Sequence, residues 1–144
     1  MFSCRINNTL KPSAYLTALL QALRRAGWFP VTVLVVHLIC VHVLDLYTIW
    51  PPIDIPMHFL GGMSIAYFAS AFLTALQRHN RSVRLDPFLH CTVAVCAACT
   101  MAVLWEFAEW TSDNVFVSSA QGGRNDTMRA LMVGGAGATP FALP

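Results

Sequence analysis

Two groups of acidic side chains in this sequence have spacings that would gather them on helix faces. Asp54 and His58 are four residues apart, so a helix that starts there would place both on one face. Glu106, Glu109 and Asp113 follow the pattern i, i+3 and i+7, which also places them on one face. Two such faces at the same level would repel each other unless a divalent cation, bound protons or a basic partner neutralised them.

A divalent metal ion is one partner that this set of side chains could hold. Zn, Mn or Fe would suit a site that includes His58, and Mg or Ca would suit the carboxylates alone. Such an ion could make hydroxide from bound water near neutral pH, which is the basis of metal-assisted hydrolysis. In that interpretation Asp113 or Asp126 is the predicted catalytic residue that orients the water or acts as the general base. The predicted metal ligands are Asp54, His58, Glu106 and Glu109.

Interfacial chemistry is the alternative interpretation of the same residues. Carboxylates near helix ends can be solvated at a membrane surface, and Asp54 could simply cap the helix that follows it. Trp50, Trp105 and Trp110 fit an aromatic belt at such a surface. Glu106 is the strongest single candidate for a functional group, because it lies deepest in an apolar run and ionisable groups inside membranes usually have a function.

The composition indicates that these residues belong to a membrane protein. Of the 144 residues, 56% are hydrophobic and 11% are charged, whereas an average soluble domain has roughly 25% charged residues. A soluble monomer with this composition would lack the polar groups that its surface needs. The balance therefore excludes a free soluble domain, a disordered chain and a nucleic-acid binder as first interpretations.

The apolar segments predict the elements that would position the acidic groups. A membrane-spanning helix needs about 20 apolar residues, and residues 28–49, 57–76 and 88–110 meet this requirement. A fourth segment, 128–143, is short, rich in glycine and interrupted by Pro140. The predicted fold is an all-α polytopic membrane helix bundle with three to four transmembrane helices.

The N-terminal segment is predicted to lie in the membrane surface. Between residues 13 and 26 the large apolar side chains fall on one helical face and polar ones on others, which is typical of an interfacial amphipathic helix. We therefore divide the chain into a cytoplasmic N-terminus that contains this helix, 1–27, and a single membrane-embedded helical domain, 28–144.

The basic residues predict the orientation of the chain. Lys and Arg near helix ends tend to stay in the cytoplasm; Arg24 and Arg25 precede the first predicted span, and Arg78 and Arg84 lie between the second and third. This predicts a multi-pass protein of the inner (plasma) membrane with a cytoplasmic N-terminus. Of the seven acidic residues, only Asp86 then lies on the inner side. The positive-inside rule hardly constrains acidic residues, so this segregation suggests that they converge for a reason.

Further polar residues occur within the first predicted span. His42 and Asp45 are three residues apart and could pair, whereas His37 needs a partner that faces the bundle. Ligation of haem or a metal and a proton relay are the functional interpretations. We favour an interhelical hydrogen bond.

Short motifs in the chain resemble the YjdF-like family of small bacterial inner-membrane proteins, whose function is uncharacterised. They are DIPMHFLGG at 54–62, WEFAEW at 105–110 with Asp113, and NDT at 125–127. The aspartate and histidine of the first motif are more distantly similar to those of the VanZ-like membrane proteins. The resemblance covers residues 45–137 and implies a helical membrane bundle with a shared acidic site. The residues of this chain that the resemblance assigns to that site are Asp54, His58, Glu106, Glu109, Asp113 and Asp126.

The chain also departs from the pattern of that family. Where the family tends to have a second Asp in its last motif, and then an Asn ahead of a Gly, this chain has Ala130 and Gly134. Part of the polar site implied by the resemblance is therefore missing or rebuilt here.

Three classes of function compete for this site. The first is a divalent-metal-dependent hydrolase that acts at the outer membrane face on a lipid or envelope substrate. The second is a transport protein that handles ions or protons, and the third is a small accessory subunit of a larger membrane complex. The sequence contains no motif that identifies a particular reaction, and it contains no internal repeat of the kind that forms transport paths in many transporters. The expected partners are the lipid bilayer, a lipid-like substrate and a homo-oligomer or another membrane subunit, but not nucleic acid.

Overall fold

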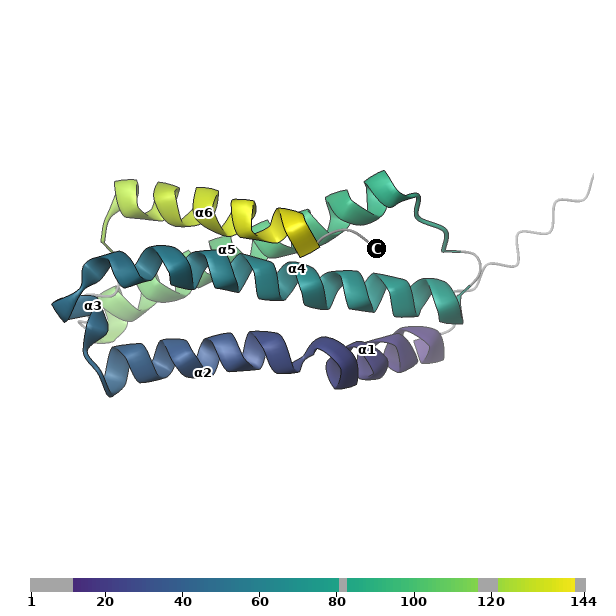
Figure 1. Cartoon of the computed structure of the whole chain (residues 1–144), viewed down its shortest axis with the longest axis horizontal. Coiled ribbons are helices and arrows are strands. Elements are labelled where there is room, and N and C mark those ends of the chain that lie inside the picture. The colour runs from purple at the N-terminus through teal and green to yellow at the C-terminus, as the bar shows by residue number, and fades with distance from the viewer. Residues whose placement is uncertain (1–11, 81–82, 117–121, 142–144) are drawn as a thin grey trace, which may run out of the picture.

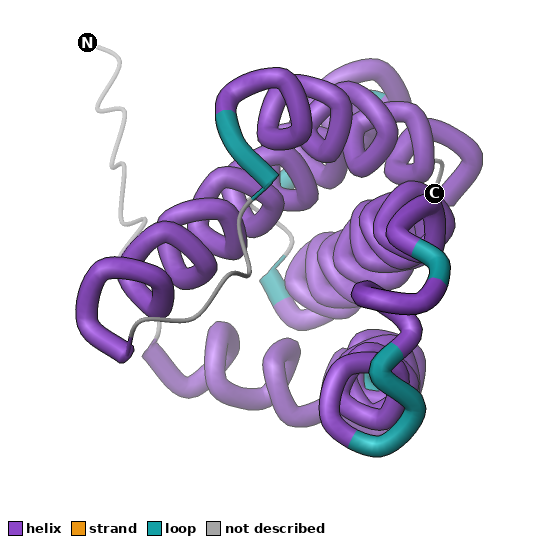
Figure 2. The backbone as a smooth tube through the Cα atoms, turned by 90° about the vertical axis from the view of Figure 1, so that its left-hand side faces the viewer, coloured by secondary structure: helices purple, strands orange, loops and turns teal. Residues whose placement is uncertain are grey.

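The chain forms a bundle of helices in the computed structural model, which describes residues 12–80, 83–116 and 122–141. Its α-helices are α1 (Pro12–Ala26), α2 (Trp28–His42), α3 (Leu46–Ile49), α4 (Asp54–His79), α5 (Pro87–Phe116) and α6 (Arg124–Ala138). The short 3-10 helices η1 (Pro51–Ile53) and η2 (Thr139–Phe141) precede α4 and follow α6. Figure 2 shows helices and loops alone in this described part, which confirms the all-α class.

Helix α4 is the centre of the bundle. In Figure 1 it runs through the middle, with α1 and α2 on one side, α6 on the other and α5 crossing behind it. It packs against each of these four helices. Small side chains make many of the buried contacts: Ala66, Ala98 and Ala138 form one cluster between α4, α5 and α6. Small residues allow helix backbones to approach closely, as is common in membrane bundles.

The length and composition of the helices support a membrane-embedded fold. Two segments, Pro51–His79 and Pro87–Val115, are long and apolar enough to cross a membrane. Helices α1 and α2 pass the same test only as a pair, which bends by 56° at the break, so the described residues contain up to three such spans. Helix α6 is not one of them, since its 15 residues rise about 22 Å and the hydrocarbon layer is about 30 Å thick.

The first predicted span, 28–49, was too long, because α2 ends at His42. Asp45 adopts the left-handed conformation, with φ 49° and ψ 32°, and such a residue cannot continue a right-handed helix. The chain then reverses through α3 and through Pro51 and Pro52, which begin η1. This reversal brings Tyr47 of α3 back against α2.

Helix α1 packs against α4 with its small residues. Ala18, Ala22 and Ala26 are fully buried, and Ala18 contacts a cluster on α4. The larger apolar side chains of the predicted interfacial face, such as Leu16 and Leu20, are exposed. Membrane lipid would cover them, so the interfacial placement of α1 stays a prediction.

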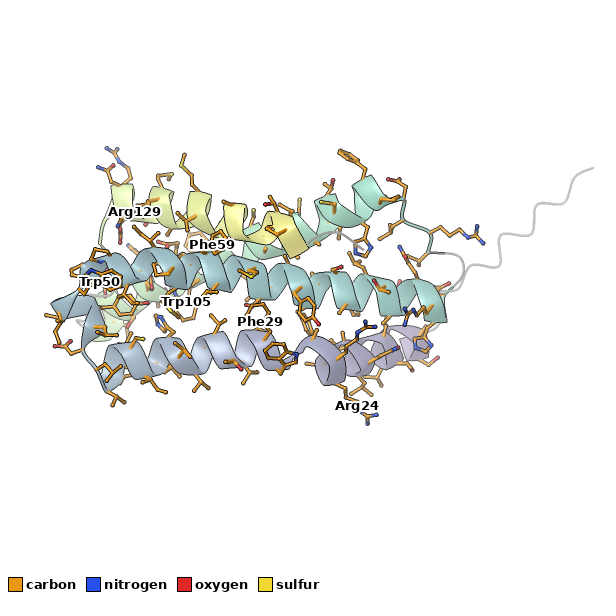
Figure 3. All side chains as sticks on the ribbon, in the orientation of Figure 1. Arg24, Phe29, Trp50, Phe59, Trp105 and Arg129 are labelled. Carbon is orange, nitrogen blue, oxygen red and sulfur yellow. The ribbon has the colours of Figure 1, made fainter. Side chains whose placement is uncertain are left out.

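Helix α6 approaches α4 most closely at glycines. A methyl group at Gly62 would overlap the carbonyl oxygen of Gly134, and one at Gly137 would overlap the carbonyl oxygen of Phe59. Figure 3 shows Phe59 between these two helices. The glycines therefore allow α6 to pack directly against the part of α4 that contains Phe59 and Gly62.

Helix α5 has a well-defined start. The carboxylate of Asp86 accepts a hydrogen bond from the backbone N–H of Leu89, with Oδ1 and N 3.0 Å apart. Pro87 occupies the first helical position, where its missing N–H costs nothing. From this start α5 runs alongside α4 and carries its acidic residues to the end of the bundle where α4 begins.

Candidate metal centre

The first turns of α4 and the last turns of α5 bring a histidine and two carboxylates together. The ligand atoms of His58, Glu106 and Glu109 all lie within 4.8 Å of one another. In Figure 3 these turns lie at the end of the bundle that carries the labelled Trp50, with Trp105 beside them. The helix faces predicted from the spacings of Asp54 with His58 and of Glu106 with Glu109 do meet.

His58 contacts carboxylates on both helices of this cluster. Its Nε2 atom is 3.2 Å from Oδ1 of Asp54, one turn earlier on α4, and 3.8 Å from Oε1 of Glu106 on α5. Glu106 is only 5% exposed, so its carboxylate is out of reach of bulk solvent. A carboxylate buried this deeply needs a charged or hydrogen-bonding partner, and His58 is close enough to be one.

Glu109 is held by a tryptophan on its own helix. The indole Nε1–H of Trp105 donates a hydrogen bond to Oε1 of Glu109, and the two atoms are 2.8 Å apart. This contact uses one carboxylate oxygen and leaves the other for a further partner. Trp105 thus orients Glu109 rather than serving only as an interfacial aromatic residue.

His37 and Tyr47 complete the wall around Trp105. Nδ1 of His37 and the hydroxyl oxygen of Tyr47 are 2.8 Å apart, which is hydrogen-bond distance. The His37 ring also meets the Trp105 ring edge to face, with centroids 4.9 Å apart. Burial raises the pKa of the Tyr47 phenol above its ordinary value of 10.0, and the nearby Asp54 carboxylate adds to this. The phenol is therefore protonated at neutral pH and able to donate to His37.

The separations in the cluster are close to those around a metal ion. Ligand atoms that bind zinc at about 2.0–2.1 Å in a tetrahedron lie about 3.3 Å apart. The distance of 3.8 Å between His58 Nε2 and Glu106 Oε1 is only slightly longer. The group as a whole lies within 4.8 Å, so side-chain rotations that draw the ligand atoms inward would complete a site with one imidazole nitrogen and two carboxylates. That donor set suits Zn, Mn or Fe.

The other predicted site residues have different surroundings. Asp54 touches His58 but is outside the converging group of three. Asp126, in the first turn of α6, forms an ion pair with Arg129, whose side chain points away from the bundle in Figure 3. Asp113 is half-buried two turns beyond Glu106 on α5 and is also outside the group.

Several polar contacts of the structure were not specified by the sequence analysis, which named Glu109 and Trp105 without their hydrogen bond and favoured an interhelical hydrogen bond for His37 without naming its partner. The i, i+4 spacing of Trp105 and Glu109 could have revealed their hydrogen bond. The contact of His37 with Tyr47 depends on the reversal at Asp45, for which the sequence has no clear signal. In the other half of the bundle, Oγ of Ser70 and Nε2 of the buried His90 are 2.9 Å apart, which satisfies a polar pair between α4 and α5.

A cavity of about 240 Å³ opens beside the cluster. His58, His37, Tyr47 and Trp105 line one part of it, and the rest of the lining is largely apolar. A ligand in this cavity would therefore contact the histidine of the cluster directly.

The comparisons with known proteins identify a family and leave its chemistry open. A family model described as "Predicted membrane protein (DUF2238)" matches residues 13–143. This match confirms the resemblance to the YjdF-like family. No curated protein and no solved structure matches the chain.

Proposed function

This chain belongs to the membrane-protein family whose model matches residues 13–143. We propose that it binds a divalent metal ion between α4 and α5 and uses it to hydrolyse a lipid or envelope substrate at the outer membrane face. His58, Glu106 and Glu109 would be the ligands. The observation that carries the proposal is the convergence of their ligand atoms within 4.8 Å beside a cavity.

The number of ligands favours catalysis over a purely structural role. Structural zinc sites are closed by four protein ligands, whereas catalytic sites have three and keep one position for water. A metal ion bound here would bring the pKa of such a water to about 7 and supply hydroxide for the attack on an ester or phosphoester. Asp54, whose Oδ1 atom is 3.2 Å from Nε2 of His58, is a carboxylate beside the site that would accept the proton of that water. The roles of Asp113 and Asp126 as catalytic residues stay predictions.

The distribution of charge supports an outer location for the site. Arg24 and Arg25 end α1, and Arg78 lies in the last turn of α4. Figure 3 shows Arg24 toward the end of the bundle away from Trp50. Because basic residues tend to remain inside, we propose that the N-terminus is cytoplasmic and that the cluster faces the outside of the inner membrane.

Metal content tests this proposal directly. We expect detergent-purified protein, dialysed against a weak chelator, to retain close to one divalent ion per chain. Glu106→Gln removes one charged oxygen donor at nearly constant volume and should lose that ion. Elemental analysis by inductively coupled plasma mass spectrometry measures both.

Asp45→Asn is the matched control for the metal measurement. It makes the same chemical change at an exposed carboxylate, and asparagine tolerates the left-handed backbone of that position. The control should keep its metal. Equal metal content in wild type and Glu106→Gln would contradict the proposal.

Proton binding is the second candidate, and one observation favours it. His58 lies within ion-pair distance of both Asp54 and Glu106, so a protonated imidazole could balance one of these two carboxylate charges without any metal. Absence of metal from all three proteins in the elemental analysis would support this candidate. Proton flux into proteoliposomes that Glu106→Gln abolishes would then be expected.

A further inference from the structure

The cavity beside the cluster has a polar end and an apolar end. Along α2 its lining runs from Pro30 to His37, and along α5 it runs from Ala98 to Trp105. Each of these intervals is seven residues, so the cavity is about 10 Å deep in the direction of the helices. His58 of α4 lies at the polar end, and Ile65 of the same helix lies seven residues deeper.

The mouth of the cavity opens sideways between α2 and α5. Both helices pack against α4, and side chains of all three helices line the cavity between them. Leu34 of α2 and Met101 of α5 line the cavity, yet they are 44% and 46% exposed. These two side chains therefore mark an opening on the outer surface of the bundle. Because α4 and α5 have the length and composition of membrane spans, this surface faces lipid rather than water.

The lining of the cavity and the surroundings of its mouth select its occupant. The deep end is lined mainly by apolar side chains such as Val33 and Ile65, and the mouth lies on α5, which has the length and composition of a membrane span. A water cluster would find few polar partners among the apolar side chains of the deep end. A single hydrocarbon chain is narrow, apolar and abundant at the mouth.

We propose that one hydrocarbon chain of a membrane lipid enters this cavity from the side, between α2 and α5, and places the polar head of that lipid at His58. The substrate of the site is then a lipid whose hydrolysable ester or phosphoester lies next to its chain. The position of the chain follows from the cavity alone, and only the reaction of the head group rests on the proposed metal site.

Gly61 offers a way to close the cavity without disturbing the helices. It lines the cavity, and a methyl group at this position would meet no atom within 4 Å. Gly61→Leu should therefore place an isobutyl group in the space that the chain would occupy. Leu34→Trp would narrow the mouth from the opposite wall and provides a second, independent variant.

Photo-cross-linking with a fatty acid that carries a diazirine in its chain tests the proposal. The full-length protein in detergent micelles is labelled, and the cross-linked peptides are identified by mass spectrometry. We expect labelled peptides that contain Leu34 or Met101, and a decrease of about tenfold in this labelling for Gly61→Leu, equivalent to about 1.4 kcal/mol of binding. Leu34→Trp should act in the same direction. Ala108→Leu, an exposed position on α5 outside the cavity, should label like wild type.

The outcomes separate this inference from the proposed metal site. Glu106→Gln should label like wild type, because Glu106 does not line the cavity. Loss of metal in Glu106→Gln together with unchanged labelling in Gly61→Leu would overturn the lipid inference and leave the metal site standing. Labelling that depends on Gly61 in a protein without metal would overturn the metal site and leave the lipid inference standing. Thermal unfolding of each variant in the same detergent verifies that the bundle is intact.

Discussion

Replacing His58 with glutamine is expected to lower the affinity of the protein for Zn²⁺ by more than about 100-fold, since even changes to the outer partners of metal ligands cost about 10–100-fold. His58 supplies the one nitrogen donor of the converging group. Glutamine has a similar length, but its neutral amide is a far weaker ligand for zinc than an imidazole. Competition with a fluorescent chelator in detergent measures the affinity of each protein.

His42→Gln is the matched control for this substitution. His42 is exposed at the end of α2 and outside the group of converging ligands. The same change there should leave the Zn²⁺ affinity as it is in wild type. An unchanged affinity in His58→Gln, with an intact bundle by thermal unfolding, would show that the zinc ion binds elsewhere or only adventitiously.

Gly62→Ala is expected to destabilise the bundle by about 1–3 kcal/mol, the usual range for overpacking. The added methyl group would overlap the carbonyl oxygen of Gly134 on α6. That oxygen belongs to helix backbone and cannot rotate away as a flexible side chain would. Helix α6 must therefore move off α4, and thermal unfolding in detergent should show a lower midpoint.

The preceding residue in α4 provides the control for Gly62. Gly61→Ala adds the same methyl group where no atom lies within 4 Å. Alanine also favours a helix interior over glycine by up to about 1 kcal/mol, so the unfolding midpoint of Gly61→Ala should equal or exceed that of wild type. Equal midpoints for both alanine variants would mean that α6 does not pack closely on α4.

The candidate site could be predicted from sequence because its pattern is local to each helix. Spacings of three and four residues place Asp54 with His58, and Glu106 with Glu109, on common helix faces. The segregation of acidic residues to the ends of apolar segments then suggested that the faces meet at one level. Convergence to within a few ångströms depends on how α4 and α5 pack, and only the structure shows it.

Features that depend on backbone geometry and tertiary contact were out of reach of the sequence. The neighbours of Asp45 are apolar, so hydropathy predicts that the first helix continues past it. The helix does not continue, because Asp45 adopts a left-handed backbone conformation, which hydropathy does not report. Trp105 looked like an interfacial residue because its hydrogen bond to Glu109 needs a side-chain direction as well as a spacing. Gly62 packs against Gly134, which lies far along the chain, so only the fold reveals which helices meet there.

X-ray absorption at the zinc edge of the Zn²⁺-loaded protein tests the central claim most directly. Three protein ligands at His58, Glu106 and Glu109 predict nitrogen and oxygen neighbours at about 2.0–2.1 Å and no sulfur at about 2.3 Å. They also predict the outer-shell scattering of a single imidazole, which disappears in His58→Gln. Sulfur ligation, or imidazole scattering that persists in His58→Gln, would contradict a metal centre between α4 and α5.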